Sequence, residues 1–236
     1  MSRFILVHGA WHGAWCWEKV TPLLEERGHS VVTPNLPLAD GLDAYVAAVR
    51  GALDEAAEPS ILVGHSMAGA VVSQVADALP EKIERLVFLT AFAPQDGESI
   101  NTLARTNIAT GLRDNVVPAE DGGGVVVKPE VIRDCFYHDC TDEDVAWAIE
   151  RLRPQNPAAF GTPLTLSPER YGKVSKQYIE CIEDQAIHIH LQRVMAQRAG
   201  CTLVNSLQTS HSPFLSAPAQ LVAHLATIGI KDARKP

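Results

Sequence analysis

A serine between two small residues carries the clearest chemistry in this chain. Ser66 stands in the run Gly64-His65-Ser66-Met67-Ala68, between an apolar segment and a helical pattern. A serine at a sharp strand-to-helix turn holds its Oγ above a sheet, ready for nucleophilic attack, and small neighbours two residues away prevent a clash. Glycine is usual at the second small position, so Ala68 departs from the strict pattern while staying small. Because a serine in so short a motif can also simply cap a helix, the rest of the chain must decide.

A base and an orienting carboxylate follow in the order that such a nucleophile requires, which is Ser, then Asp or Glu, then His. Asp184 comes just after the strand predicted at residues 176–181, and His211 lies between the last predicted strand and the last predicted helix. We expect Asp184 to accept a hydrogen bond from the His211 ring and His211 to face Ser66. Glu183 is adjacent and competes with Asp184 for the orienting role.

Backbone N–H groups for a developing oxyanion are expected at two points. The run His8-Gly9-Ala10 directly follows the first apolar segment, so the N–H of Ala10 and the N–H of Met67 can face the same oxygen. A His-Gly pair by itself is also an ordinary strand-to-loop turn. Ala10 and Met67 are therefore the predicted oxyanion donors on the condition that Ser66 is the nucleophile.

Apolar runs and helical patterns alternate along most of the chain and predict the elements that position these residues. Strands are predicted at residues 3–7, 29–33, 60–64, 83–90, 176–181 and 202–206, and helices at 17–27, 42–56, 66–79, 187–198 and 217–228. Parallel strands need crossover helices between them. The alternation therefore predicts an α/β fold, with a mostly parallel sheet that helices cover on both faces.

The alternation breaks between residues 93 and 174, a stretch with seven prolines and a triple-glycine turn. We interpret residues 93–174 as a cap inserted into a core domain formed by residues 1–92 and 175–236. Loops at the carboxyl ends of parallel strands form the ligand crevice, so the cap is expected to cover Ser66. Aromatic residues at these places more often belong to the core, but four are candidates to line a substrate pocket: Trp11, Phe92, Phe136 and Trp147.

Composition limits the classes of partner. The formal net charge of −8 lacks the clusters of Lys and Arg that hold nucleic acid, so no nucleic-acid partner is expected. The odd number of five cysteines favours reduced thiols and a cytoplasmic protein. The apolar run Phe4–Val7 is too short for a secretory segment or a membrane span, so no membrane partner is expected either.

Metal binding is also not expected. Cys135, His138 and Cys140 have a composition that suits zinc, but no fourth ligand follows at a suitable spacing. The predicted chemistry needs no cofactor.

Several motifs together resemble one known family. The run His8-Gly9-Ala10-Trp11-His12-Gly13-Ala14-Trp15-Cys16-Trp17 closely resembles the opening of the plant methylesterases and hydroxynitrile lyases, which are α/β-hydrolases. The Ser66 motif, residues 91–94, the Asp184 loop and His211-Ser212-Pro213 are similar as well, so the resemblance covers nearly the whole chain and is weakest in the cap. It implies an α/β-hydrolase fold, the triad Ser66, Asp184 and His211, the oxyanion donors Ala10 and Met67, and a substrate contact at Phe92. Bacterial relatives of this family are known or thought to be esterases.

Two positions separate the esterase and lyase branches of that family. The lyase pattern has Thr after the first-motif His and Lys after the catalytic His, whereas this chain has Gly9 and Ser212. Without the cation that would meet a cyanide ion, the sequence favours hydrolysis of a carboxylic ester through an acyl-enzyme. The expected partner is a small to medium ester with an apolar or aromatic part. Two alternatives stay open, a hydroxynitrile lyase-type C–C lyase and a non-catalytic small-molecule binding protein on the same scaffold. The sequence also leaves open whether the chain forms a homodimer.

Overall fold

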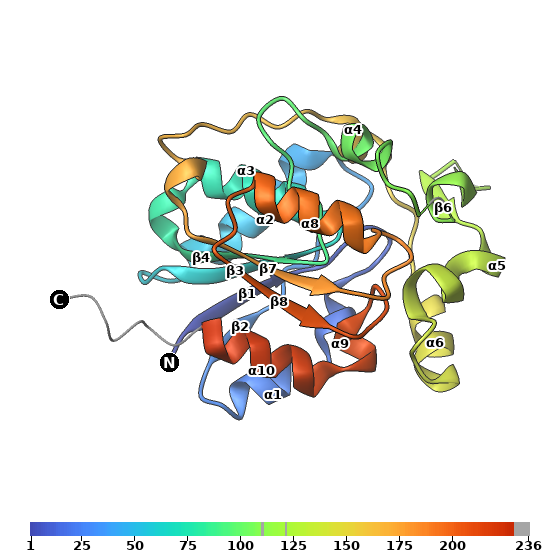
Figure 1. The fold of residues 1–236 in the computed structure, drawn as a ribbon, viewed down its shortest axis with the longest axis horizontal. Helices are drawn as coiled ribbons and strands as arrows, with labels where there is room; N and C mark the ends of the chain where they lie inside the picture. The colour runs from blue at the N-terminus through green and yellow to red at the C-terminus, as the bar shows by residue number, and fades with distance from the viewer. Residues whose placement is uncertain (110, 121, 229–236) are drawn as a thin grey trace.

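The computed structural model describes residues 1–109, 111–120 and 122–228, and its centre is one six-stranded sheet (Figure 1). In spatial order its strands are β2 (Ser30–Val32), β1 (Arg3–Val7), β3 (Ser60–His65), β4 (Ile83–Leu89), β7 (Lys176–Cys181) and β8 (Leu203–Leu207). Each neighbouring pair is parallel. The predicted parallel sheet is therefore confirmed, and each of its six strands corresponds to one of the six predicted strands.

Helices cover both faces of the sheet, as predicted. Helices α2 (Leu42–Asp54), α3 (Ala68–Ala78) and α8 (Ile189–Arg198) lie on one face, and α1 (Thr21–Glu25) and α10 (Pro218–Ile228) lie on the other (Figure 1). Every residue of β3 and of β7 is buried. Strand β3 reads as the nearly continuous apolar run that is typical of a strand buried on both faces, whereas β7 also buries Lys176, Gln177 and Glu180.

Each of the five predicted helices differs from the structure by one to four residues at one or both ends, and two of these differences have a clear cause. The helix expected at residues 17–27 is a short 3₁₀ turn, η1 (Ala14–Trp17), followed by the single-turn helix α1, which Pro22 starts. The helix expected from residue 66 begins at Ala68, because Ser66 adopts a left-handed backbone conformation that no α-helix contains.

The segment between β4 and β7 has its own small elements. They are α4 (Ile100–Ala104), the 3₁₀ turn η3 (Arg113–Asn115), β5 (Val116–Pro118), β6 (Val125–Val127), α5 (Pro129–Ile132), the π-helical turn η4 (Arg133–Tyr137), α6 (Asp142–Ile149), α7 (Ala158–Gly161) and the 3₁₀ turn η5 (Tyr171–Lys173). Strands β5 and β6 pair with each other in an antiparallel ladder, and Val125 of β6 also forms an isolated antiparallel bridge with Gln155. Elements β6, α5 and α6 gather at the end of the molecule toward which β7 and β8 point (Figure 1). The division of the chain into core and cap stays a prediction, but the segment lies where a cap would.

Within the described ranges, no helix is both long enough and apolar enough to span a bilayer.

Candidate active site

Ser66 follows the last residue of β3 and has a φ of 55°, a conformation that costs energy for any residue with a side chain. Two backbone hydrogen bonds hold it there. The Ser66 N–H donates to the Leu89 carbonyl at 3.3 Å, and the Ser66 carbonyl accepts from the Phe92 N–H at 3.1 Å. The end of β4 therefore fixes the sharp turn that presents the Ser66 side chain.

Close packing explains the small residues around this turn. A Cβ on Gly64 would lie 2.7 Å from Val72 Cγ2, and a Cβ on Gly69 would lie 1.9 Å from the Phe92 carbonyl oxygen. Neither distance is compatible with a side chain. Ala68 is fully buried with its methyl group in place, so the position at which the turn excludes a side chain is 69, one residue beyond the place the strict motif assigns.

His211 and Asp184 meet in the buried interior next to this turn. His211 donates from Nδ1 to Asp184 Oδ2 at 2.6 Å, and both side chains are almost fully buried. Asp184 Oδ1 accepts from the backbone N–H groups of Ala186 at 2.6 Å and Ile187 at 2.9 Å. Both carboxylate oxygens are thus held, and the proton on His211 Nδ1 leaves Nε2 free to act as an acceptor.

Two further side chains support the carboxylate and were not foreseen from the sequence. Thr90 Oγ1 donates to Asp184 Oδ2, and Gln192 Nε2 lies 3.4 Å from the same oxygen. Glu183, the competing carboxylate, is exposed, and its backbone forms the bonds here: the N–H donates to the Thr209 carbonyl at 3.1 Å and the carbonyl accepts from His138 Nε2 at 2.9 Å. The structure therefore places Asp184, rather than Glu183, against the His211 ring.

His65, the residue before Ser66, contacts the loop that carries His211. Its Nε2 donates to the His211 backbone carbonyl at 2.8 Å, and the two ring centroids are 4.6 Å apart. Complete burial lowers the pKa of His65 well below its usual value, so the ring is neutral. The partner lies on a loop 146 residues away in the chain, so this bond is a tertiary contact that no local pattern encodes.

Two further buried histidines, His8 and His12, hold the loop after β1. His8 accepts from the Leu36 N–H through Nε2 at 3.0 Å and donates from Nδ1 to the Gly9 carbonyl at 2.9 Å. His12 donates from Nδ1 to the Ala10 carbonyl at 2.7 Å and accepts from the Tyr137 hydroxyl through Nε2 at 2.7 Å. Burial lowers the pKa of His8 to about 4 and that of His12 to about 3.

These bonds set the direction of the peptide groups in the loop. In a trans peptide the carbonyl and the following N–H point to opposite sides, so fixing the Gly9 carbonyl turns the Ala10 N–H away from His8. The carbonyl of Trp11, which follows that of Ala10, accepts from the Arg153 N–H at 2.9 Å. Three consecutive carbonyls, of residues 9, 10 and 11, are each bonded to a donor.

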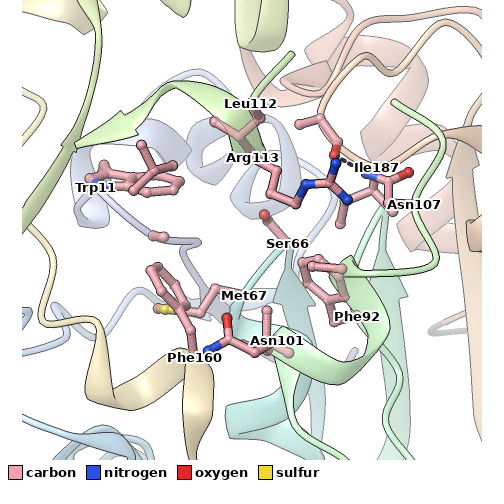
Figure 2. Close-up of a pocket in the computed structure, with 15 residues that line it drawn as sticks. Trp11, Ser66, Met67, Phe92, Asn101, Asn107, Leu112, Arg113, Phe160 and Ile187 are labelled. Atoms are coloured by element: carbon pink, nitrogen blue, oxygen red, sulfur yellow. Dashed lines mark hydrogen bonds between the residues drawn. The ribbon is translucent and has the colours of Figure 1, made fainter. Parts of the chain in front are cut away.

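A cavity of about 190 Å³ opens beside Ser66, and Figure 2 shows its walls. The predicted oxyanion donors Ala10 and Met67 line it together with Ser66, as do two of the four predicted aromatics, Trp11 and Phe92. The remaining lining residues are Ile100, Asn101, Ala104, Asn107, Leu112, Arg113, Val116, Phe160, Ala186 and Ile187. Most of them come from the segment between β4 and β7, in which no periodic pattern marked them.

The other two predicted aromatics do not line this cavity. Phe136 is buried behind it, with its ring centroid 5.9 Å from that of Trp11 and 5.6 Å from that of His211. Trp147 packs edge-on against Trp15 at 5.2 Å, with the Arg151 guanidinium 4.4 Å above its ring. Both are packing residues of the segment around the site.

No group of three or more His, Cys, Asp or Glu side chains in the described part of the chain is arranged to hold a metal ion. Cys135 and Cys140 are free thiols.

Comparison with known proteins adds independent support for the fold. Residues 4–225 match the model of a family described as "Alpha/beta hydrolase family". Among curated proteins, the chain is 32% identical over 244 residues to the pyrethroid hydrolase of Sphingobium wenxiniae (strain DSM 21828 / CGMCC 1.7748 / JZ-1), covering 96% of this chain and 87% of that protein. It is 31% identical over 257 residues to salicylic acid-binding protein 2 of Nicotiana tabacum, covering 98% of each.

Among solved structures, the crystal structure of polyneuridine aldehyde esterase superposes with a TM-score of 0.87. The sequence identity is 26%, and the match covers 97% of this chain and 99% of that one. The similarity therefore extends over nearly the whole length, including the segment between β4 and β7.

Proposed function

Because this chain belongs to the alpha/beta hydrolase family, we propose that it is a serine carboxylesterase whose catalytic residues are Ser66, His211 and Asp184. The observation that carries this proposal is the buried hydrogen bond of 2.6 Å between His211 Nδ1 and Asp184 Oδ2, close to a serine in a strained turn. Nucleophile, base and orienter of an acyl-transfer site need this arrangement.

In the proposed mechanism Ser66 Oγ attacks the ester carbonyl carbon, and His211 Nε2 takes the hydroxyl proton. The carbonyl oxygen becomes an oxyanion that the backbone N–H groups of Ala10 and Met67 bind. His211 then gives its proton to the leaving alcohol, and the C–O bond of the ester breaks to leave an acyl-enzyme. Asp184 keeps the Nδ1–H tautomer throughout and stabilises the imidazolium.

Water completes the cycle. His211 Nε2 removes a proton from the water, whose oxygen attacks the acyl carbon, and a second oxyanion forms at the same two N–H groups. The bond to Ser66 Oγ then breaks, Ser66 regains the proton from His211, and the carboxylic acid leaves. These steps need no cofactor.

Packing at Gly9 supports hydrolysis over the lyase reaction. A Cβ at this position would lie 2.9 Å from Ser66 Cβ and 3.0 Å from His65 Nδ1, so the threonine of the lyase pattern does not fit here without movement of the turn. The residue after His211 is the buried Ser212, which offers no positive charge. A small ester with an apolar part suits the cavity, since most of its lining residues are apolar.

The named relatives support the same interpretation, since one is named as a hydrolase of pyrethroids and another as an esterase of polyneuridine aldehyde. Salicylic acid-binding protein 2 is named for binding, which keeps a non-catalytic binding protein as an outcome for the experiment to exclude.

The decisive experiment measures hydrolysis of 4-nitrophenyl acetate and covalent labelling by a fluorophosphonate. We expect the wild type to show both and Ser66→Ala to show neither. Ser216→Ala removes a buried hydroxyl that has no hydrogen-bond partner among the described residues and does not line the cavity, so it is the control and should keep both. A folded wild type that binds salicylate but is neither labelled nor active would support the binding protein, and cyanide release from mandelonitrile would support the lyase.

A further inference from the structure

Arg113 is the one residue with a formal charge among the described residues that line the cavity. It begins the turn η3, just before β5, in the segment that covers the site. Figure 2 shows its side chain extending across the cavity that Ser66 also lines, with the guanidinium near Asn107. A positive charge therefore faces the space in which the acyl or alcohol part of an ester would lie.

The bonds made by Arg113 leave most of its donors unused. Its Nε donates to Asp114 Oδ1 at 3.0 Å, and both side chains are about half exposed. An ion pair in that setting contributes little free energy, so it holds the guanidinium only weakly and leaves it able to pair with another anion. Among the described residues the two Nη groups, with four N–H donors, have no hydrogen-bond partner.

The neighbouring amide does not satisfy those donors either. Asn107 donates from Nδ2 to the Ala186 carbonyl at 2.8 Å and accepts through Oδ1 from the His188 N–H at 3.1 Å. It is buried and rigidly held. It ties the stretch after α4 to the loop that follows Asp184, so the Arg113 Nη donors are left to water or to a ligand in the cavity.

Charge and geometry indicate which ligand that is. The chain has a formal net charge of −8, so a cation inside an otherwise apolar cavity is the local exception and attracts an anion to this point. A guanidinium matches a carboxylate with two parallel N–H···O bonds. A phosphate dianion calls for several cationic or backbone donors, whereas here one cation lines the cavity.

We propose that Arg113 is an anion subsite and that the preferred substrate is a half-ester of a dicarboxylic acid, whose free carboxylate pairs with Arg113 while its ester carbonyl lies at Ser66. This inference rests on the proposed esterase function and goes further by naming the substrate class. Arg113 acts as a specificity residue that touches substrate but takes no part in proton transfer.

The test compares the monomethyl esters of succinic, glutaric and adipic acid with the methyl esters of butyric, valeric and hexanoic acid. The rate of hydrolysis is measured through the protons that the acid product releases. In the wild type we expect at least one half-ester to have a higher kcat/KM than the neutral ester of the same carbon number. In Arg113→Gln the ratio of kcat/KM for the half-ester to kcat/KM for the neutral ester falls about ten-fold, the size of one charge-assisted hydrogen bond. Arg113→Lys keeps part of the preference, and added salt reduces the preference of the wild type.

Arg133→Gln is the matched control. Arg133 lies in the same segment, forms a similar pair with Asp142 at 2.7 Å, and has a side chain exposed to 46%, against 45% for Arg113, but it does not line the cavity. We expect this variant to keep the full preference. Asp114→Asn, which frees Arg113 from its neighbour, should raise the preference.

The outcomes separate this inference from the proposed function. If neutral esters are cleaved in a Ser66-dependent manner but Arg113→Gln leaves the ratio of charged to neutral substrate unchanged, or Arg133→Gln lowers it equally, the anion subsite is wrong and the esterase stands. If no ester is cleaved, the esterase is wrong. Binding of monomethyl adipate to Ser66→Ala, measured by calorimetry with and without Arg113→Gln, then still tests the subsite, and equal affinities overturn it.

Discussion

The ring of His65 donates a hydrogen bond of 2.8 Å to the backbone carbonyl of His211, so the residue before the proposed nucleophile holds the loop of the proposed base. The two catalytic positions are therefore connected directly as well as through the sheet. Because the bond joins the end of β3 to the loop after β8, a shift of one of them displaces the other.

Replacing His65 tests this connection. His65→Leu removes the donor and leaves the His211 carbonyl buried without a partner, which costs about 2 kcal/mol of unfolding free energy. We expect kcat to fall at least ten-fold as well, because the base is displaced. In His65→Gln the amide Nε2 can donate to the same carbonyl and should recover part of both losses. Urea unfolding and 4-nitrophenyl acetate hydrolysis measure the two effects, and equal behaviour of the two variants would contradict the connection.

The two adjacent carboxylates should differ sharply in their effect on activity. Asp184→Asn replaces the acceptor of the His211 Nδ1–H with an amide and favours the wrong tautomer, so we expect kcat to fall by roughly four orders of magnitude. Glu183→Gln changes an exposed side chain that does not contact the ring and should leave kcat unchanged. Comparable losses in both variants would show that the orienting role has been placed on the wrong residue.

Position 69, rather than position 68, should be intolerant of a side chain. Gly69→Ala forces a methyl group against the Phe92 carbonyl, which lies 1.9 Å from the Cβ position, and we expect a loss of about 3 kcal/mol in unfolding free energy. Ala68→Gly restores the strict motif and should cost about 1 kcal/mol with no gain in kcat. Thermal or urea unfolding of the two variants provides the measurement, and a larger loss in Ala68→Gly would be the contrary result.

Buried neutral histidines should make the protein sensitive to mild acid. Burial lowers the pKa of His12 to about 3 in the folded chain, whereas an unfolded histidine titrates near 6.5. As the pH falls below about 6.5, the unfolded state takes up a proton that the folded state does not, so the unfolding free energy falls. The slope is about 1.4 kcal/mol per pH unit for each such residue.

Urea unfolding at several pH values measures that slope. Between about pH 6 and pH 4 the slope for His12→Gln should be smaller than that of the wild type by about 1.4 kcal/mol per pH unit, since glutamine does not titrate. Identical slopes for the two proteins would mean that His12 is not held neutral in the folded state.

Much of the sheet could be predicted from sequence because several buried strands are apolar runs of their own, as at β1 and β3. The short strand β5 could not, since Val116–Pro118 has three residues and becomes a strand only by pairing with β6. Helix α1 was overestimated because Val20, Leu23 and Leu24 have helical spacing, although only residues 21–25 form the α-helix.

The residues of the proposed site also divide into those that the sequence indicates and those that only the structure brings together. Chain order and the small residues around Ser66 predict Ser66, Asp184 and His211 from the sequence alone. The choice between Asp184 and Glu183 depended on the N–H groups of residues 186 and 187, which turn back onto one carboxylate. Arg113 and Phe160 reach the cavity from stretches without periodicity, so their approach to Ser66 is visible only in three dimensions.

The three anchored carbonyls of residues 9, 10 and 11 determine when the protein bears the entropic cost of aligning its oxyanion donors. A loop with free peptide groups would have to turn an N–H inward each time negative charge develops. Here His8, His12 and Arg153 hold the loop in one orientation from the moment the chain folds. An oxyanion at Ser66 would thus meet dipoles that are already aligned, so the reorganisation energy is spent once in folding rather than in every catalytic cycle.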